Sequence, residues 1–158
     1  MTEDKTINEF RYFDGYQSGG RMVYLNDKLY LTIGDYNNWE LPQDNISLFG
    51  KTVEINIKTN SYKIISKGHR NHQGLQVFSE NDNLIISSEH GPKGGDEINL
   101  INLNDNLEKN NFGWPLASYG DHYDVVPLNS YTNKFAPLYK SHAKYGFIEP
   151  IFIFQEAI

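Results

Sequence analysis

The chain has 158 residues, of which 39% are hydrophobic and 22% charged, a balance that allows a packed core and excludes an intrinsically disordered chain. Its net charge of −6 argues against a nucleic-acid partner, which needs a basic surface, and is compatible with cation binding. The absence of cysteine excludes disulfides and thiol chemistry, and no apolar run approaches the roughly 18 residues of a membrane span.

The first half of the chain predicts an antiparallel meander. Alternating apolar and polar residues favour strands, and short runs of Asn, Asp and Thr mark the turns between them. Segments of this kind are residues 21–25, 28–33, 52–57 and 62–66. A polar loop that contains Pro42 separates the second from the third.

The pattern recurs about fifty residues further on, where residues 75–78, 84–87 and 97–101 read as strands. A four-stranded unit that repeats at roughly this period is typical of a β-propeller blade. A β-sandwich with ordinary hairpins is the alternative that the pattern leaves open. We therefore expect an all-β fold and favour the propeller.

The second half of the chain is less regular. Residues 104–147 contain clustered Asn and Asp and the triplet Gly113-Trp114-Pro115, and they read as one long loop. Residues 147–154 then form an apolar segment that reads as a last strand. An apolar strand left at a sheet edge promotes aggregation, so we expect something to cover it.

Between the strands that end near Ser87 and begin near Glu97 lies an unusual corner. It holds a Gly-Pro pair, a Gly-Gly pair and two carboxylates. A plain turn needs only one or two such residues. The excess suggests a backbone bent so that carbonyl oxygens face a ligand, and a hard cation is the natural partner for carbonyls and carboxylates.

Four segments together resemble the soluble glucose/sorbosone dehydrogenase family, which uses pyrroloquinoline quinone (PQQ) on a six-bladed β-propeller. They are residues 18–21 with 30–35, residues 68–75, residues 88–99 and residues 111–115. Their order and spacing make the set specific, and the match runs from about residue 14 to the end.

The resemblance covers only part of the family's fold and implies a partial propeller, a fragment of about two four-stranded antiparallel blades with one long loop insertion. The implied parts are a first blade at 14–68, the start of a second at 69–103, the long loop at 104–147 and a final strand at 148–158, where a further blade begins in the family. Because repeat architectures need neighbours to bury each face, self-association that completes the blade ring is one implied possibility.

The resemblance also implies site residues. Arg70 and Asn71 match the pair that contacts PQQ, although by themselves they read as an ion-pairing arginine and a turn asparagine. Gly91 and Pro92 match the positions whose main-chain carbonyls hold the Ca²⁺ of the cofactor, although a structural corner explains them equally. The residues of a second, structural Ca²⁺ site are implied to be the Glu97 carboxylate, the Phe112 carbonyl, Asp121 and the Glu149 carboxylate, and solvated surface acids are the plain alternative.

One position departs from the family pattern. The family's general base is a histidine four residues before an arginine, and that register gives Gln17 before Arg21. An amide does not accept a hydroxyl proton at neutral pH, and losing a general base typically costs about 10²–10⁴ in rate. Of the neighbouring residues, Asp35 is expected to stabilise a strand-end turn, and Trp114 to wedge the long loop onto a blade.

Three interpretations follow. The first is part of a PQQ- and Ca²⁺-dependent dehydrogenase that oxidises the C1 hydroxyl of an aldose by hydride transfer to the quinone, impaired in this chain. The second is a non-catalytic propeller module that binds Ca²⁺ and a sugar or protein, and the third is a decayed fragment. The resemblance implies a periplasmic or secreted location, although residues 1–5 are acidic and polar and show no signal-peptide pattern.

Overall fold

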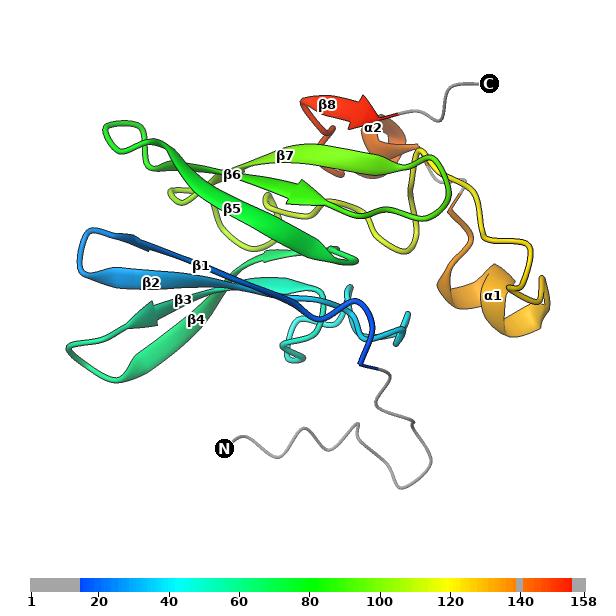
Figure 1. Ribbon diagram of the computed structural model, residues 1–158, viewed down its shortest axis with the longest axis horizontal. Helices are drawn as coiled ribbons and strands as arrows, with labels where there is room; N and C mark the ends of the chain where they lie inside the picture. Colours follow the sequence, from blue (N-terminus) through cyan, green and yellow to red (C-terminus); the bar gives the residue numbers. More distant parts are fainter. Residues whose placement is uncertain (1–14, 139–140, 155–158) are drawn as a thin grey trace.

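The computed structural model describes residues 15–138 and 141–154 and shows an all-β fold of two four-stranded antiparallel sheets (Figure 1). The N-terminal residues read above for a signal peptide, and residues 155–158 of the expected final strand, lie outside the described part. Sheet 1 contains β1 (Gly19–Leu25), β2 (Lys28–Ile33), β3 (Lys51–Asn56) and β4 (Ser61–Lys67), in that order. Sheet 2 contains β5 (His72–Ser79), β6 (Leu84–Glu89), β7 (Asp96–Asn102) and β8 (Phe152–Phe154). The predicted strands and their meander order are confirmed.

The last strand differs from expectation. The resemblance implied that a further blade begins here, and that reading is wrong for this structure. Strand β8 pairs with β7 and completes sheet 2, with Ile98 opposite Phe152 and Glu97 opposite Ile153. The Ile151 amide also donates to the Ile98 carbonyl, at 2.9 Å. The open edge of β7 offers unpaired backbone groups, and β8 satisfies them.

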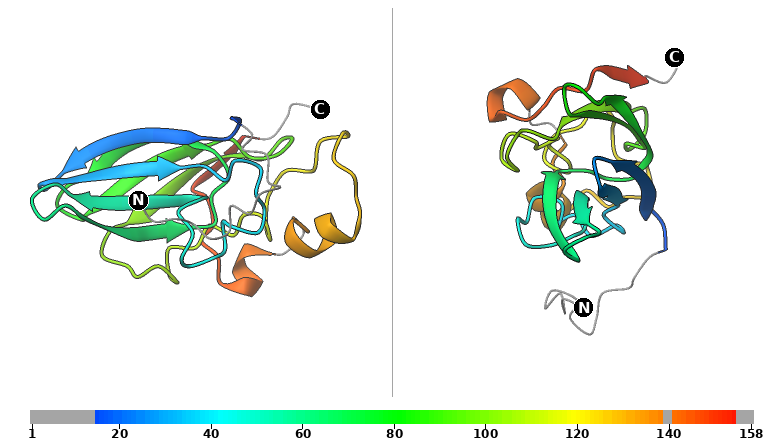
Figure 2. Two further views of the ribbon diagram at one scale, coloured as in Figure 1. Left: turned by 90° about the horizontal axis from the view of Figure 1, so that it is seen from below. Right: turned by 90° about the vertical axis from the view of Figure 1, so that its left-hand side faces the viewer.

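The two sheets pack face to face, with the first strands β1 and β5 lying beside each other, as the end-on view in Figure 2 shows. Alternation along each strand sends one set of side chains into the space between the sheets. The core there consists of Leu25, Tyr30, Ile65, Leu75, Ile85, Ile101 and Phe112. Ile85 and Ile101 are fully buried, and each such side chain stabilises the fold by roughly 1.5–3 kcal/mol.

The segment between β7 and β8 is not one structureless loop, because it contains two short helices at one end of the sheets (Figure 1). Helix α1 (Ser130–Phe135) is capped by Asn129, whose side chain accepts from two backbone amides, and α2 (His142–Tyr145) is capped by Ser141. Within the described residues, no helix is long and apolar enough to cross a membrane.

The start of this segment is tied to sheet 1 and so closes the gap between the sheets. The buried Asn110 side chain donates to the Ile65 carbonyl at 3.0 Å and to the Asn102 carbonyl at 2.8 Å. The Phe112 amide donates to the Lys67 carbonyl at 2.9 Å. These bonds fix the Gly113-Trp114-Pro115 triplet beside the loops that follow β2 and β4, where the candidate site lies.

Candidate functional site

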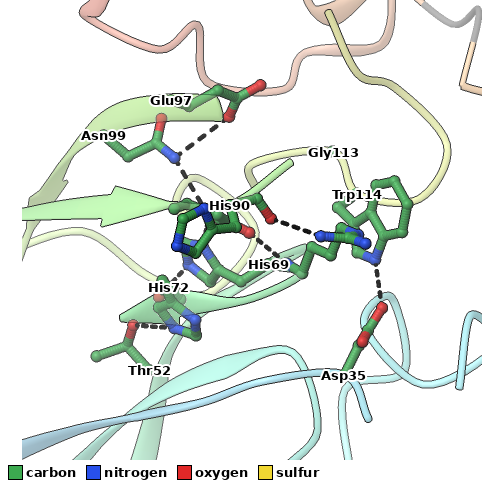
Figure 3. A network of polar contacts seen from close by, with 12 residues as sticks. Asp35, Thr52, His69, His72, His90, Glu97, Asn99, Gly113 and Trp114 are labelled. Carbon is green, nitrogen blue, oxygen red and sulfur yellow. Dashed lines mark hydrogen bonds and ion pairs between the residues drawn. The ribbon is translucent and has the colours of Figure 1, made fainter. Parts of the chain in front are cut away.

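Side chains from five separate segments meet at the end of the sheets where the loops gather. They are the segment before β1, the loop after β2, the connection from β4 to β5, the corner between β6 and β7, and the segment after β7. Figure 3 shows Asp35, His69, His90 and Trp114, which come from four of these segments. The convergence brings together Gln17, Arg70 and Gly91, which the sequence had placed in three different motifs.

Arg70 lies at the centre of this group. Its Nη1 donates to the His90 carbonyl at 3.0 Å and to the Gly91 carbonyl at 2.7 Å. Its guanidinium carbon lies 5.6 Å from the centre of the Trp114 ring, within the range of a cation–π contact. The guanidinium is therefore held between two carbonyls and an aromatic face, and this leaves Nη2 directed at the neighbouring segments.

Asp35 and Trp114 hold the other side of the group. The Trp114 Nε1 donates to Asp35 Oδ2 at 2.7 Å, and the Asn37 amide donates to Asp35 Oδ1 at 2.9 Å. The second bond is the Asx turn expected at this strand end, and Trp114 is buried as the expected wedge. Burial raises the pKa of Asp35 to about 7, against the hydrogen bonds from Asn37 and Trp114 and the charge of Arg70, which lower it.

Gln17, the position expected for the family's base, lies directly beside Arg70. With its amide oriented to satisfy its neighbours, its nitrogen donates to Asp35 Oδ1 at 2.7 Å and its oxygen accepts from Arg70 Nη2 at 3.1 Å. The backbone of Gln17 has φ 59°, in the left-handed region. The side chain is thus held by a carboxylate and a guanidinium, and it acts as a spacer between them.

The other predicted cofactor and Ca²⁺ residues already have hydrogen-bond partners. The buried Asn71 accepts from the Gly19 amide at 3.1 Å through Oδ1, which fixes the start of β1. The Gly91 carbonyl accepts from Arg70, and the Pro92 carbonyl accepts from the Gly95 amide at 2.9 Å. A guanidinium on the Gly91 oxygen opposes a second cation there, so the corner as it lies does not fit Ca²⁺. Calcium ligation by Gly91 and Pro92 stays a prediction.

A buried carboxylate that the sequence analysis missed positions Arg70. Glu89 accepts from His69 Nδ1 at 2.9 Å, from Asn99 Nδ2 at 3.3 Å and from the Arg70 backbone amide. His69 in turn accepts from Ser66 Oγ at 2.8 Å and stacks on His72, with ring centres 4.1 Å apart. The alternation of side chains along β6 could have revealed it. Glu89 lies two residues after Ser87 and four after Ile85, so all three side chains are on the buried face of the strand.

The residues implied for a second Ca²⁺ site are only partly brought together. Glu97 and Phe112 line a narrow cavity of about 10 Å³ together with Arg70, roughly the space of one water-sized sphere. Glu149 is close enough for its charge to raise the pKa of Glu97. Asp121, however, is exposed and lines a different hollow. No three His, Cys, Asp or Glu side chains among the described residues form a metal-binding group.

The pKa of the Glu97 side chain is strongly raised. Burial, and then the neighbouring charge of Glu89, raise its pKa from the usual 4.5 to about 8, while the hydrogen bond from Asn99 lowers it. A raised pKa means that the folded chain holds a proton that the unfolded chain releases. The stability that this proton supplies is complete below pH 4.5 and is lost as the pH rises through 8.

Replacing Glu97 by glutamine should therefore flatten the pH dependence of stability. At pH 5 we expect the variant to match the parent chain, and at pH 9 to be more stable by a few kcal/mol, since one pKa unit corresponds to about 1.4 kcal/mol. Urea unfolding at the two pH values measures the difference. Glu80→Gln, at an exposed position, is the control. Parallel loss of stability in all three chains would contradict the assignment.

Comparison with known proteins adds the family context. A family model described as Glucose / Sorbosone dehydrogenase matches residues 3–158. The aldose sugar dehydrogenase YliI of Escherichia coli (strain K12) is 30% identical, over 90% of this chain and 38% of that protein. Quinoprotein glucose dehydrogenase B of Acinetobacter calcoaceticus is 31% identical, over 67% of this chain and 27% of that protein.

Solved structures give the same picture. The apo form of the soluble aldose sugar dehydrogenase from Escherichia coli superposes with a TM-score of 0.66 at 30% identity, over 88% of this chain and 40% of that one. The PQQ-bound form of aldose sugar dehydrogenase from Streptomyces coelicolor superposes with a TM-score of 0.59 at 26% identity, over 87% and 36%. The chain thus spans about two fifths or less of these relatives, which are β-propellers.

Proposed function

Because the chain belongs to the glucose/sorbosone dehydrogenase family, we propose that it supplies part of the cofactor pocket of a PQQ-dependent sugar dehydrogenase. The observation that carries the proposal is the position of Arg70, held by the His90 and Gly91 carbonyls against the Trp114 ring with Gln17 beside it. Relatives named as quinoproteins or solved with PQQ support the choice of cofactor. The substrate class proposed with it is an aldose.

When bound, PQQ would supply an acceptor for the hydride from C1 of the aldose. The role of Arg70 is to place a fixed positive charge where an oxygen becomes negative, and its two carbonyl partners keep it from turning away. Trp114 supplies a flat apolar wall beside the guanidinium. Asn71 uses its amide oxygen on Gly19, so only its N–H groups are available to a ligand.

The proposal also includes Ca²⁺ binding, which is limited by the oxygen atoms available to the ion. The Gly91 carbonyl serves a cation only after Arg70 releases it, because both positive charges compete for one oxygen. The narrow cavity beside Glu97 and Phe112 holds only one water-sized occupant. We assign no step of the reaction to Ca²⁺ in this chain.

A second candidate function is a non-catalytic propeller module that binds a sugar or a protein. The observation that favours it is Gln17, whose amide is engaged by Asp35 and Arg70 at the position of the family's base. An amide in this place supports ligand binding and does not remove a proton. The residue at position 17 therefore distinguishes the two candidate functions.

We expect the parent chain, supplied with PQQ and Ca²⁺, to show negligible dye-linked oxidation of glucose. A Gln17→His variant should gain measurable turnover, because an imidazole accepts the hydroxyl proton and a restored base is worth about 10²–10⁴ in rate. Histidine is among the residues that tolerate a positive φ, so the backbone at this position accepts the change.

Gln17→Asn serves as the control, since it shortens the side chain without supplying a base. Robust turnover by the parent chain would refute the impaired-base reading. Equal, negligible turnover in all three chains, with PQQ bound by each, would favour the non-catalytic module.

A further inference from the structure

A lysine that the sequence analysis did not single out lies fully buried at the start of β3. The Lys51 side chain is 0% exposed, and its ammonium group donates to three backbone carbonyls. They belong to Leu41 at 2.8 Å, Pro42 at 3.0 Å and Phe49 at 2.7 Å. Because an ammonium group has three N–H bonds, these acceptors match its donors one to one. The backbone of a single loop thus surrounds a charge inside the chain.

All three carbonyls belong to residues 34–50, the loop after β2. The loop is closed where it meets the strands, because the Gly50 amide donates to the Gly34 carbonyl at 3.0 Å. Within it the backbone turns back so that the three oxygens converge on one nitrogen. Converging carbonyl oxygens repel one another unless a positive charge lies between them, and binding sites for hard cations are built from the same oxygens. The shape of this loop therefore requires a cation.

The position of Lys51 is costly for a charged side chain. Burial of an ammonium group is unfavourable unless polar groups replace its water. Lys51 also lies opposite Lys67 in the pairing of β3 with β4, and like charges in such a pair destabilise a sheet. The charge of Lys67 is balanced by the Glu108 carboxylate, at 2.7 Å. The three carbonyls stabilise the charge of Lys51, so the loop and the ammonium group depend on each other.

The same loop holds two parts of the candidate site. Asp35, near its start, accepts from Trp114 Nε1 at 2.7 Å, and the Gln43 side chain donates to the Trp114 carbonyl at 2.7 Å. The Asp35 amide also donates to the Arg70 carbonyl, at 2.8 Å. The loop that closes around Lys51 therefore sets the position of the aromatic wall beside Arg70.

We propose that Lys51 is the built-in cation of the loop after β2 and a positioning residue for Trp114. Its ammonium group takes the place that a bound metal ion has in a carbonyl site, but it is covalently attached and does not exchange. It acts on Trp114 through Asp35 and Gln43, which contact the indole ring and the backbone of that residue. The inference does not depend on the proposed cofactor, because all of these contacts lie within the chain.

Removing the ammonium group and returning it in solution tests the proposal. Lys51→Ala deletes the side chain beyond Cβ, and n-propylammonium has the missing carbons and nitrogen. The experiment uses a Trp39→Phe background, which leaves Trp114 as the only tryptophan. We expect Lys51→Ala to shift the Trp114 emission to longer wavelength and to lower the melting temperature by roughly 10 °C or more, because three buried carbonyls lose their donor. n-Propylammonium should reverse both changes saturably, because it binds the folded chain.

Two other compounds and one variant are the controls. 1-Propanol has nearly the same shape without the charge, tetramethylammonium has the charge without N–H groups, and neither should reverse the changes. Lys109→Ala removes a side chain that is 70% exposed and should respond to none of the three compounds. If Lys51→Ala does not fold by itself, refolding with each compound, followed by circular dichroism, gives the same comparison. The proposal is overturned if Lys51→Ala keeps the emission and melting temperature of the parent, if a control compound restores them equally, or if n-propylammonium does not restore both.

Discussion

Replacing Glu89 by alanine should lower the free energy of unfolding by about 3–5 kcal/mol, the usual cost of removing one partner from a buried charged group. The change leaves the His69 ring, the Asn99 amide and the Arg70 backbone amide without their common acceptor. It also frees the connection from β4 to β5, which carries Arg70. Urea unfolding at pH 7, followed by tryptophan fluorescence, measures the loss.

Two further variants make this result specific. Glu89→Gln keeps one oxygen as acceptor and should fall between the parent and the alanine variant. Glu80→Ala removes an exposed carboxylate and should change the free energy of unfolding by less than about 0.5 kcal/mol. If the alanine variants at positions 89 and 80 were equally stable, the carboxylate would not hold the site together.

Replacing Arg70 by alanine should weaken PQQ binding by about 10- to 100-fold. Hydrogen bonds to charged groups are worth roughly 1.5–3 kcal/mol, and each 1.4 kcal/mol is a factor of ten in affinity. Arg70→Lys should recover only part of the loss, because an ammonium lacks the planar fork that the two carbonyls and the Trp114 ring hold. Isothermal titration calorimetry of each chain with PQQ measures the affinity.

The control for Arg70 is Arg21→Ala, which removes an exposed arginine from the start of sheet 1. It carries the same change of charge, so it separates a local contact from general attraction of an anionic cofactor. Equal affinities in the Arg70 and Arg21 variants would show that the guanidinium at position 70 is not part of the pocket.

The sheets could be predicted from the sequence because period-two alternation and turn residues act locally. The hairpin from Arg21 to Ile33 is the clearest case, since both strands and the Asn26-Asp27 turn are encoded within thirteen consecutive positions. Strand β8 itself could be predicted, but its pairing with β7 could not, because β7 is remote from it in the sequence. A segment of three apolar residues does not specify which sheet edge it pairs with. Its partner is determined by the open edge of sheet 2 in the folded chain.

The candidate site was also predicted only in part. The positions of Gln17 and Arg70 followed from motifs, but the motifs did not reveal that the two side chains touch. Glu89 was missed because a buried carboxylate is distinguished from a surface one only by the face of its strand. The sequence predicts a cation site at the corner from His90 to Glu97, and this stays a prediction; the sequence did not reveal that the Gly91 and Pro92 carbonyls accept from Arg70 and from the Gly95 amide. Glycine and proline residues encode the bend of the backbone, but the group that binds its Gly91 carbonyl, Arg70, comes from another part of the chain.

The most direct test of this account is a PQQ titration that reads Trp114 itself. The chain has two tryptophans, so a Trp39→Phe background, excited at the red edge where tyrosine does not absorb, leaves Trp114 as the only tryptophan that emits. The centre of its ring lies 5.6 Å from the guanidinium carbon of Arg70. Free N-acetyltryptophanamide corrects for absorption by the cofactor. The account predicts saturable quenching of Trp114 that weakens at least tenfold when Arg70 is replaced by alanine. Emission that falls no further than that of the free indole, or saturable quenching that survives the loss of Arg70 unchanged, would contradict it.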